Sequence, residues 1–103
     1  MSQVARYGKM TAHEGSGEKL AGILLAAADE LSGNPGCLLY LVSREQGEPD
    51  VIWVTELWRS QADLDAALEM IRGSENVTEA MSLVRDGQMI ELDLLGGKGP
   101  AAS

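Results

Sequence analysis

Glu56 is the residue of this sequence whose surroundings most clearly suggest chemistry. It lies in the segment 51–58, whose β-branched and aromatic residues favour a strand. Side chains alternate between the two faces of a strand, so Glu56 shares its face with Ile52, Val54 and Trp58. Burial of a carboxylate raises its pKa towards the range useful for proton transfer, and an indole offers a flat wall for an aromatic ligand. The segment predicts a catalytic pair, Glu56 and Trp58, with Val54 and Trp58 lining a substrate.

Arg6 and Tyr40 are the polar side chains that we expect to complete this site. Arg6 is the third expected catalytic residue, because it could stabilise an anion that develops on the substrate, and Tyr40 is expected to bind the substrate through its hydroxyl. A purely structural interpretation stays open beside this one. In that interpretation Glu56 pairs with Arg6 or Arg44, and Trp58 fills the core.

The remaining reactive side chains predict little chemistry. His13 lies in a turn and Cys37 opens an apolar segment without an adjacent cation, so we expect a solvated imidazole and an inert thiol. One histidine and one cysteine do not supply the nitrogen and sulfur ligands of common zinc or iron sites. No complete glycine-rich nucleotide fingerprint is present. We therefore expect neither a metal nor a cofactor, and we interpret Ser16, which stands three residues before Lys19, as a helix cap and not as a nucleophile.

Composition limits the partners. The 103 residues are enough for one domain, and eight Lys and Arg against sixteen Asp and Glu give a net charge of -8. Such a field repels nucleic acid and anionic lipid surfaces. The apolar runs are far shorter than the ~20 residues that cross a bilayer, and no secretory leader is evident. We expect a cytoplasmic protein that binds no nucleic acid and no membrane.

The elements that would position these residues follow from periodicity and turn signals. Asp63 three residues after Ser60 is typical of a capped helix start. The pattern predicts, in order, a strand over 4–12, a helix after Ser16 that ends before 33–36, a hairpin of strands 37–42 and 51–58, a helix from Ser60 to Gly73, a short amphipathic stripe over 77–84, a turn at Asp86-Gly87 and a last strand over 89–95. Residues 1–96 would form one domain and residues 97–103 a flexible tail.

This order of elements predicts an α+β fold of the ferredoxin-like kind, an antiparallel four-stranded sheet with the helices on one face. The strands 37–42 and 51–54 are apolar at both parities, although helices can cover only one face. The simplest cover for the second face is the same face of another copy. We therefore expect a homodimer through sheet faces, a dimeric α+β barrel.

Several segments, taken together and in order, resemble a known family. They are Ala5–Thr11, Pro35–Tyr40, Trp53–Trp58, Ser60–Leu64 and Leu94–Gly99. Over nearly its whole length the chain resembles the antibiotic biosynthesis monooxygenase family, which includes quinol monooxygenases. The resemblance implies dimers paired through their sheets and a ligand pocket between sheet and helices, near the Glu-x-Trp segment.

The resemblance also implies an activity. Characterised relatives oxidise hydroxylated aromatic polyketides or quinols with molecular oxygen and without metal, flavin or other prosthetic group. The segment 65–71 lacks histidines that are common in relatives, and the helical haem ligand of haem-degrading members has no counterpart. We therefore expect a cofactor-independent monooxygenase that takes a small aromatic substrate and O₂. A binding or carrier protein for a small aromatic ligand on the same fold is the alternative.

Overall fold

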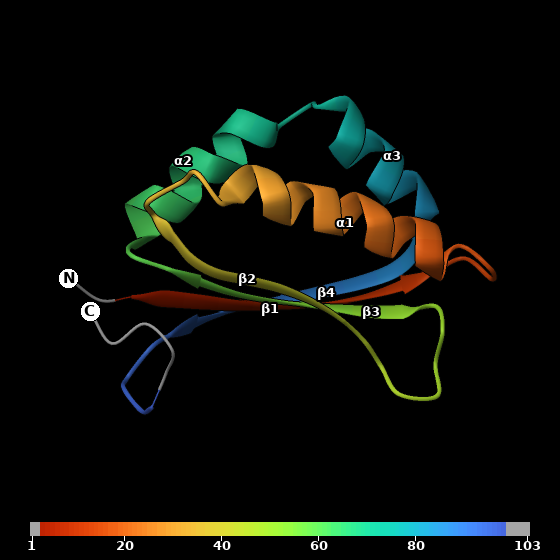
Figure 1. Cartoon of the computed structure of the whole chain (residues 1–103), viewed down its shortest axis with the longest axis horizontal. Helices are drawn as coiled ribbons and strands as arrows, with labels where there is room; N and C mark the ends of the chain where they lie inside the picture. Colours follow the sequence, from red (N-terminus) through yellow and green to blue (C-terminus); the bar gives the residue numbers. More distant parts are fainter. Residues whose placement is uncertain (1–2, 99–103) are drawn as a thin grey trace.

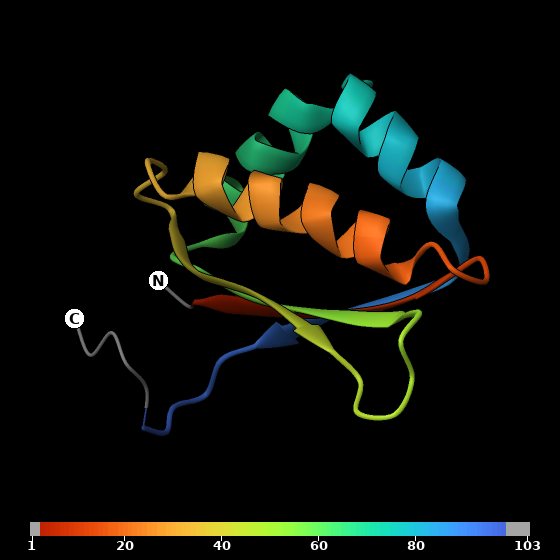
Figure 2. The same ribbon diagram turned by 45° about the vertical axis from the view of Figure 1, so that its right-hand side comes forward.

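The computed structural model describes residues 3–98 as one sheet covered by one layer of helices (Figures 1 and 2). The four antiparallel strands lie in the order β2-β3-β1-β4, which is the ferredoxin-like topology. The elements are β1 (Val4–Ala12), α1 (Gly17–Leu31), β2 (Cys37–Arg44), β3 (Val51–Trp58), α2 (Gln61–Ile71), α3 (Glu75–Leu83) and β4 (Val84–Asp93). The fold class expected from the sequence is confirmed.

The register of the strands separates the two faces of the sheet. Val54 of β3 lies opposite Gly8 of β1 and opposite Val42 of β2. Because alternate residues share a face, Ile52, Val54, Glu56 and Trp58 all point towards the helices. We call this the helix face and the other the open face.

Two buried clusters hold the helices on the helix face. The first joins α1 to the middle of the sheet through Ala12, Leu20, Leu24, Ile52 and Val54. The second joins α2 to one end of the sheet through Val4, Trp58, Leu64 and Ala67. Trp58 is only 2% exposed, so its indole is part of the packing between α2 and the sheet.

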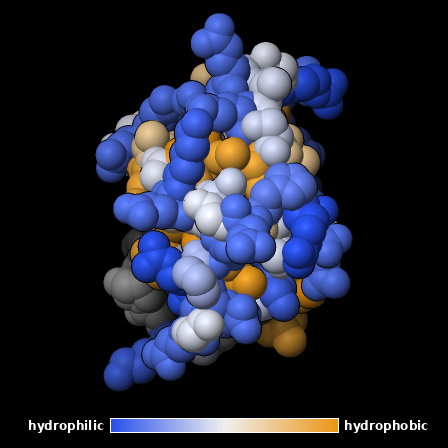
Figure 3. All heavy atoms as spheres, turned by 90° about the vertical axis from the view of Figure 1, so that its right-hand side faces the viewer, coloured by the Kyte–Doolittle hydropathy of each residue, from blue (hydrophilic) through white to orange (hydrophobic). Residues whose placement is uncertain are grey.

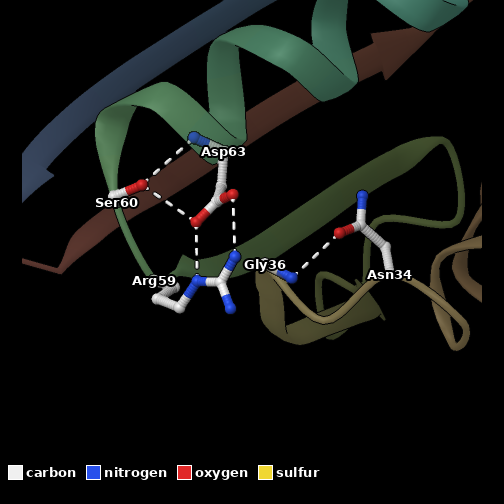
Figure 4. Close-up of polar contacts among 5 residues, drawn as sticks. All are labelled: Asn34, Gly36, Arg59, Ser60 and Asp63. Carbon is white, nitrogen blue, oxygen red and sulfur yellow. Dashed lines mark hydrogen bonds and ion pairs between the residues drawn. The ribbon is translucent and has the colours of Figure 1, made fainter.

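The start of α2 is fixed by its own sequence, as expected (Figure 4). The Ser60 hydroxyl accepts a hydrogen bond from the Asp63 amide at 3.1 Å. The Asp63 carboxylate in turn accepts two hydrogen bonds from the Arg59 guanidinium, at 2.8 and 3.1 Å. Gly36 lies against this cap, since a Cβ there would come within 2.6 Å of the Asp63 Cβ. The chain entering β2 is thereby placed beside α2.

The start of α1 is capped differently from our expectation. Ser16 occupies the cap position, but its side chain makes no capping hydrogen bond. The carboxylate of Asp50, from the β2–β3 turn, accepts hydrogen bonds from the Gly15 amide at 3.0 Å and from the Gly17 amide at 2.9 Å. These bonds hold the pKa of Asp50 below its usual value. The turn therefore supplies the cap that we assigned to Ser16.

The interpretation of Asp86-Gly87 as a turn was wrong. Both residues lie inside β4, where Asp86 pairs with Thr11 and Gly87 pairs with Met10. The register shifts between Thr11 and Ala12, so the chain leaves α3 through an irregularity at the start of the strand and needs no separate turn. The strand ends at Asp93, and residues 99–103 of the expected tail lie outside the described residues.

The open face is apolar and uncovered within the described chain. Its exposed apolar side chains include Tyr7 (45%), Leu41 (51%), Ile90 (54%) and Leu92 (42%). By contrast, the end of the molecule at the right of Figure 1 is mostly hydrophilic, with hydrophobic residues recessed between polar ones (Figure 3). Within residues 3–98 no helix is long and apolar enough to cross a membrane.

Candidate functional site

Four polar residues form one row across the helix face of the sheet. Arg6 of β1 lies opposite Glu56 of β3 and, on its other side, opposite Glu91 of β4. Tyr40 of β2 lies opposite Glu56. The order across the sheet is therefore Glu91, Arg6, Glu56, Tyr40. We call these residues the polar row, and three of them were expected from the sequence.

Glu56 is the buried carboxylate of the row, with 5% of its surface exposed. The Trp58 indole N–H donates to its Oε1 at 2.9 Å, and Arg6 Nη1 lies 3.9 Å from the same oxygen. Burial raises the pKa of Glu56, while the indole and the guanidinium oppose the rise. Both contacts are made to Oε1. Oε2 has neither contact and is therefore the oxygen that we expect to take a proton.

The Arg6 guanidinium makes fewer hydrogen bonds than a buried guanidinium usually does. Its side chain is 11% exposed, and its Nε is buried without a hydrogen-bond partner among the described residues. A buried donor without an acceptor is costly, and such groups in native proteins call for an explanation. The Nε–H of Arg6 is therefore a hydrogen-bond donor of the row that has no acceptor among the described residues.

Tyr40 lies at the other end of the row, on the sheet edge that α1 covers. Burial, and next the charge of Glu56, raise the pKa of Tyr40 to about 12. Its hydroxyl therefore stays protonated at neutral pH and is available as a hydrogen-bond donor.

A cleft lies beside Tyr40 and not beside Glu56. It has a volume of about 300 Å³ between the second half of α1 and the first half of β2. Its lining includes Leu31, Ser32, Cys37 and Tyr40. Burial raises the pKa of the Cys37 thiol, so the sulfur stays protonated and unreactive, in line with an inert role.

Trp58 and Val54 lie on the expected face but at packed positions. Val54 is 1% exposed in the cluster that joins α1 to the sheet, and Trp58 is in the cluster below α2. The structure brings Trp58, Glu56 and Arg6 together. It places Val54 two residues from Glu56 on the same strand face, next to Gly8.

Glu91 is the member of the row that the sequence did not suggest. It lies on β4, whose helix-facing side is largely uncovered: Met89 is 44% exposed and Glu91 is exposed. The Met89 side chain lies over Gly8, since a Cβ added there would come within 2.8 Å of the Met89 Cε. The row is therefore buried at Glu56 and exposed to solvent at Glu91.

No metal site is formed by the described part of the chain. Within residues 3–98, no three His, Cys, Asp or Glu side chains are grouped closely enough to hold an ion. His13 lies in the exposed turn between β1 and α1, away from the polar row.

Comparison with known proteins shows the family of the chain. The family model described as antibiotic biosynthesis monooxygenase matches residues 4–71 of the chain, which include β1, β2 and β3. The chain belongs to the antibiotic biosynthesis monooxygenase family. A search of curated proteins gave no match.

Solved structures of this family and fold superpose closely. A family protein from Chloroflexus aurantiacus shares 32% identity, with 97% of this chain and 100% of that chain covered and a TM-score of 0.83. A second family protein, from Deinococcus radiodurans, shares 22% identity over 96% of this chain and 99% of its own, with a TM-score of 0.82. A Bacteroides thetaiotaomicron protein described as a possible oxidoreductase shares 16% identity over 90% of this chain and 98% of its own, with a TM-score of 0.82. The last two support the fold alone.

Proposed function

We propose that the protein is a cofactor-independent monooxygenase that oxidises a hydroquinone or a hydroxylated polycyclic aromatic with O₂. The proposal rests on family membership and on one observation in the site. A buried carboxylate with a raised pKa lies beside a guanidinium whose Nε has no hydrogen-bond partner among residues 3–98. A proton acceptor and an anion-stabilising donor are thus adjacent, which is what removal of a phenolic proton requires.

The proposed first step is proton transfer. A phenolic hydroxyl of the substrate gives its proton to Oε2 of Glu56, and the phenolate oxygen accepts a hydrogen bond from Nε of Arg6. The raised pKa brings Glu56 closer to the operating pH, where a general base is most effective. The Trp58 N–H holds the other carboxylate oxygen in place.

The second step is oxidation of the electron-rich anion. One oxygen atom of O₂ replaces the hydrogen on a ring carbon, which becomes a carbonyl, and the other oxygen atom leaves as water. The substrate supplies all four electrons, so a phenol plus O₂ gives a quinone plus water. The protein supplies orientation and exclusion of water from the anion.

We also propose that the protein works as a homodimer through its open faces. The exposed apolar side chains there are too numerous for an uncovered face of a small chain, and a second copy presents the same surface.

A carrier function for a small aromatic ligand is the second candidate. The cleft between α1 and β2 favours it, because that cleft touches Tyr40 but is not lined by Glu56, Trp58 or Arg6. A ligand that binds only there would be held without meeting the carboxylate.

The two candidates are separated by incubating the metal-free protein with a panel of hydroquinones, aerobically and anaerobically. The monooxygenase predicts oxygen-dependent product formation that Glu56→Gln abolishes and Trp58→Phe reduces. The phenylalanine keeps the packing below α2 but removes the N–H that orients Glu56. Saturable binding without turnover above the uncatalysed rate would establish the carrier and overturn the monooxygenase.

A further inference from the structure

The charges of the polar row bear on whether a neutral or an anionic substrate is favoured there. One guanidinium, that of Arg6, lies between two carboxylates, Glu56 and Glu91, along a single line across three strands. With both carboxylates ionised, the three groups carry one net negative charge. The chain as a whole adds to this with a net charge of -8.

Glu91 is the solvent-exposed carboxylate of the polar row. The helices bury Glu56 and most of Arg6, whereas β4 keeps its helix-facing side exposed at Met89 and Glu91. A ligand that approaches Arg6 over β4 therefore meets the Glu91 carboxylate before it meets the guanidinium. Electrostatic repulsion at this point acts on any ligand that is already an anion.

We infer that Glu91 is a specificity-determining residue that favours uncharged phenols over aromatic anions of the same shape. The inference rests on the function proposed above. A neutral phenol passes Glu91 without repulsion and becomes an anion only after its proton has moved to Glu56, so the number of charges in the row is unchanged. A sulfonated or carboxylated aromatic instead brings a third negative charge to a single guanidinium. Discrimination by repulsion of the wrong ligand is a common source of specificity.

The test compares two probes with the same ring system, 2-naphthol and 2-naphthalenesulfonate, near neutral pH. Dissociation constants are measured by calorimetry on the full chain. The wild-type protein is expected to bind 2-naphthol more tightly. Glu91→Gln is expected to tighten sulfonate binding about two- to fivefold with little change for naphthol, the range typical of one exposed charge. Raising the ionic strength should shrink this difference, which a packing effect would not do.

Asp86→Asn is the matched control. It removes one negative charge from the same strand but from the open face, opposite Thr11. Equal tightening of sulfonate binding in this variant, or no tightening in Glu91→Gln, would overturn the inference while leaving naphthol binding and the proposed function intact. Absence of binding of both probes to the wild type would overturn the inference together with the proposed aromatic site.

Discussion

At the scale of single residues, two opposing influences set the pKa of Glu56. Burial raises its pKa, and the Trp58 N–H and Arg6 lower it less than burial raises it. The folded protein therefore holds this proton at pH values where the unfolded chain, with a pKa near 4.5, has lost it. The stability contributed by Glu56 must fall as pH rises through the interval from 4.5 to the raised value.

The Glu56→Gln variant tests this pH dependence. We expect the free energy of unfolding of the wild type, minus that of Glu56→Gln, to decrease as pH rises across the interval and then to level off. The measurement is urea denaturation at a series of pH values, with Glu48→Gln on the exposed β2–β3 turn as the control for loss of a carboxylate. A difference that increases with pH would mean that Arg6, and not burial, sets the state of Glu56.

At the scale of elements, Gly17 and Gly22 of α1 offer a matched pair. A Cβ at Gly17 would meet the Pro49 carbonyl oxygen and come within 2.7 Å of the Asp50 Cα, whereas a Cβ at Gly22 meets nothing within 4 Å. We expect Gly17→Ala to destabilise the fold by ~1–3 kcal/mol through overpacking against backbone. Gly22→Ala should stabilise it by ~0.5–1 kcal/mol through helix propensity. Thermal unfolding measures both, and equal effects of the two variants would contradict the contact between turn and helix.

The cap provided by Asp50 predicts an acid-sensitive helix start. Its pKa is lowered in the folded state, so the stability it contributes is present above the unfolded value of 3.8 and is lost as pH falls through the folded value. Asp50→Ala should lower the melting temperature and speed hydrogen exchange at Gly15 and Gly17. Glu48→Ala, on the same turn, is the control. Unchanged exchange at both glycine amides would show that the cap contributes nothing.

The elements were largely predictable because periodicity and caps are local signals. The strands 4–12 and 51–58 and the Ser60 cap have the predicted positions. Asp50 could not be found in this way, because its role depends on a contact across 33 residues. Glu91 was missed for a related reason: its place beside Arg6 depends on the register of the first and last strands, which the sequence does not specify. The start of β4 at Val84 was missed for the same reason, because it depends on pairing with Ala12 across a shift in register.

At the scale of the whole molecule, Leu41 and Leu25 form a matched pair that tests which surface makes the dimer. They are the same residue type with nearly equal exposure, 51% and 52%, but Leu41 lies on the open face and Leu25 on α1. We expect Leu41→Glu to convert a dimer into monomers, because a charge would be buried in the interface. Leu25→Glu, with the same charge change, should remain dimeric. Analytical ultracentrifugation measures both, and a monomeric wild type would remove the basis of the dimer proposal.

The bond between the β2–β3 turn and the first turn of α1 also has a consequence for biosynthesis. During translation, Gly17 leaves the ribosome 33 residues ahead of Asp50, so its amide has no acceptor from the turn until the hairpin emerges. The first turn of α1 in the nascent chain therefore lacks this cap until the β2–β3 turn has emerged. Completion of the helix and closure of the hairpin become one event in the assembly of the fold.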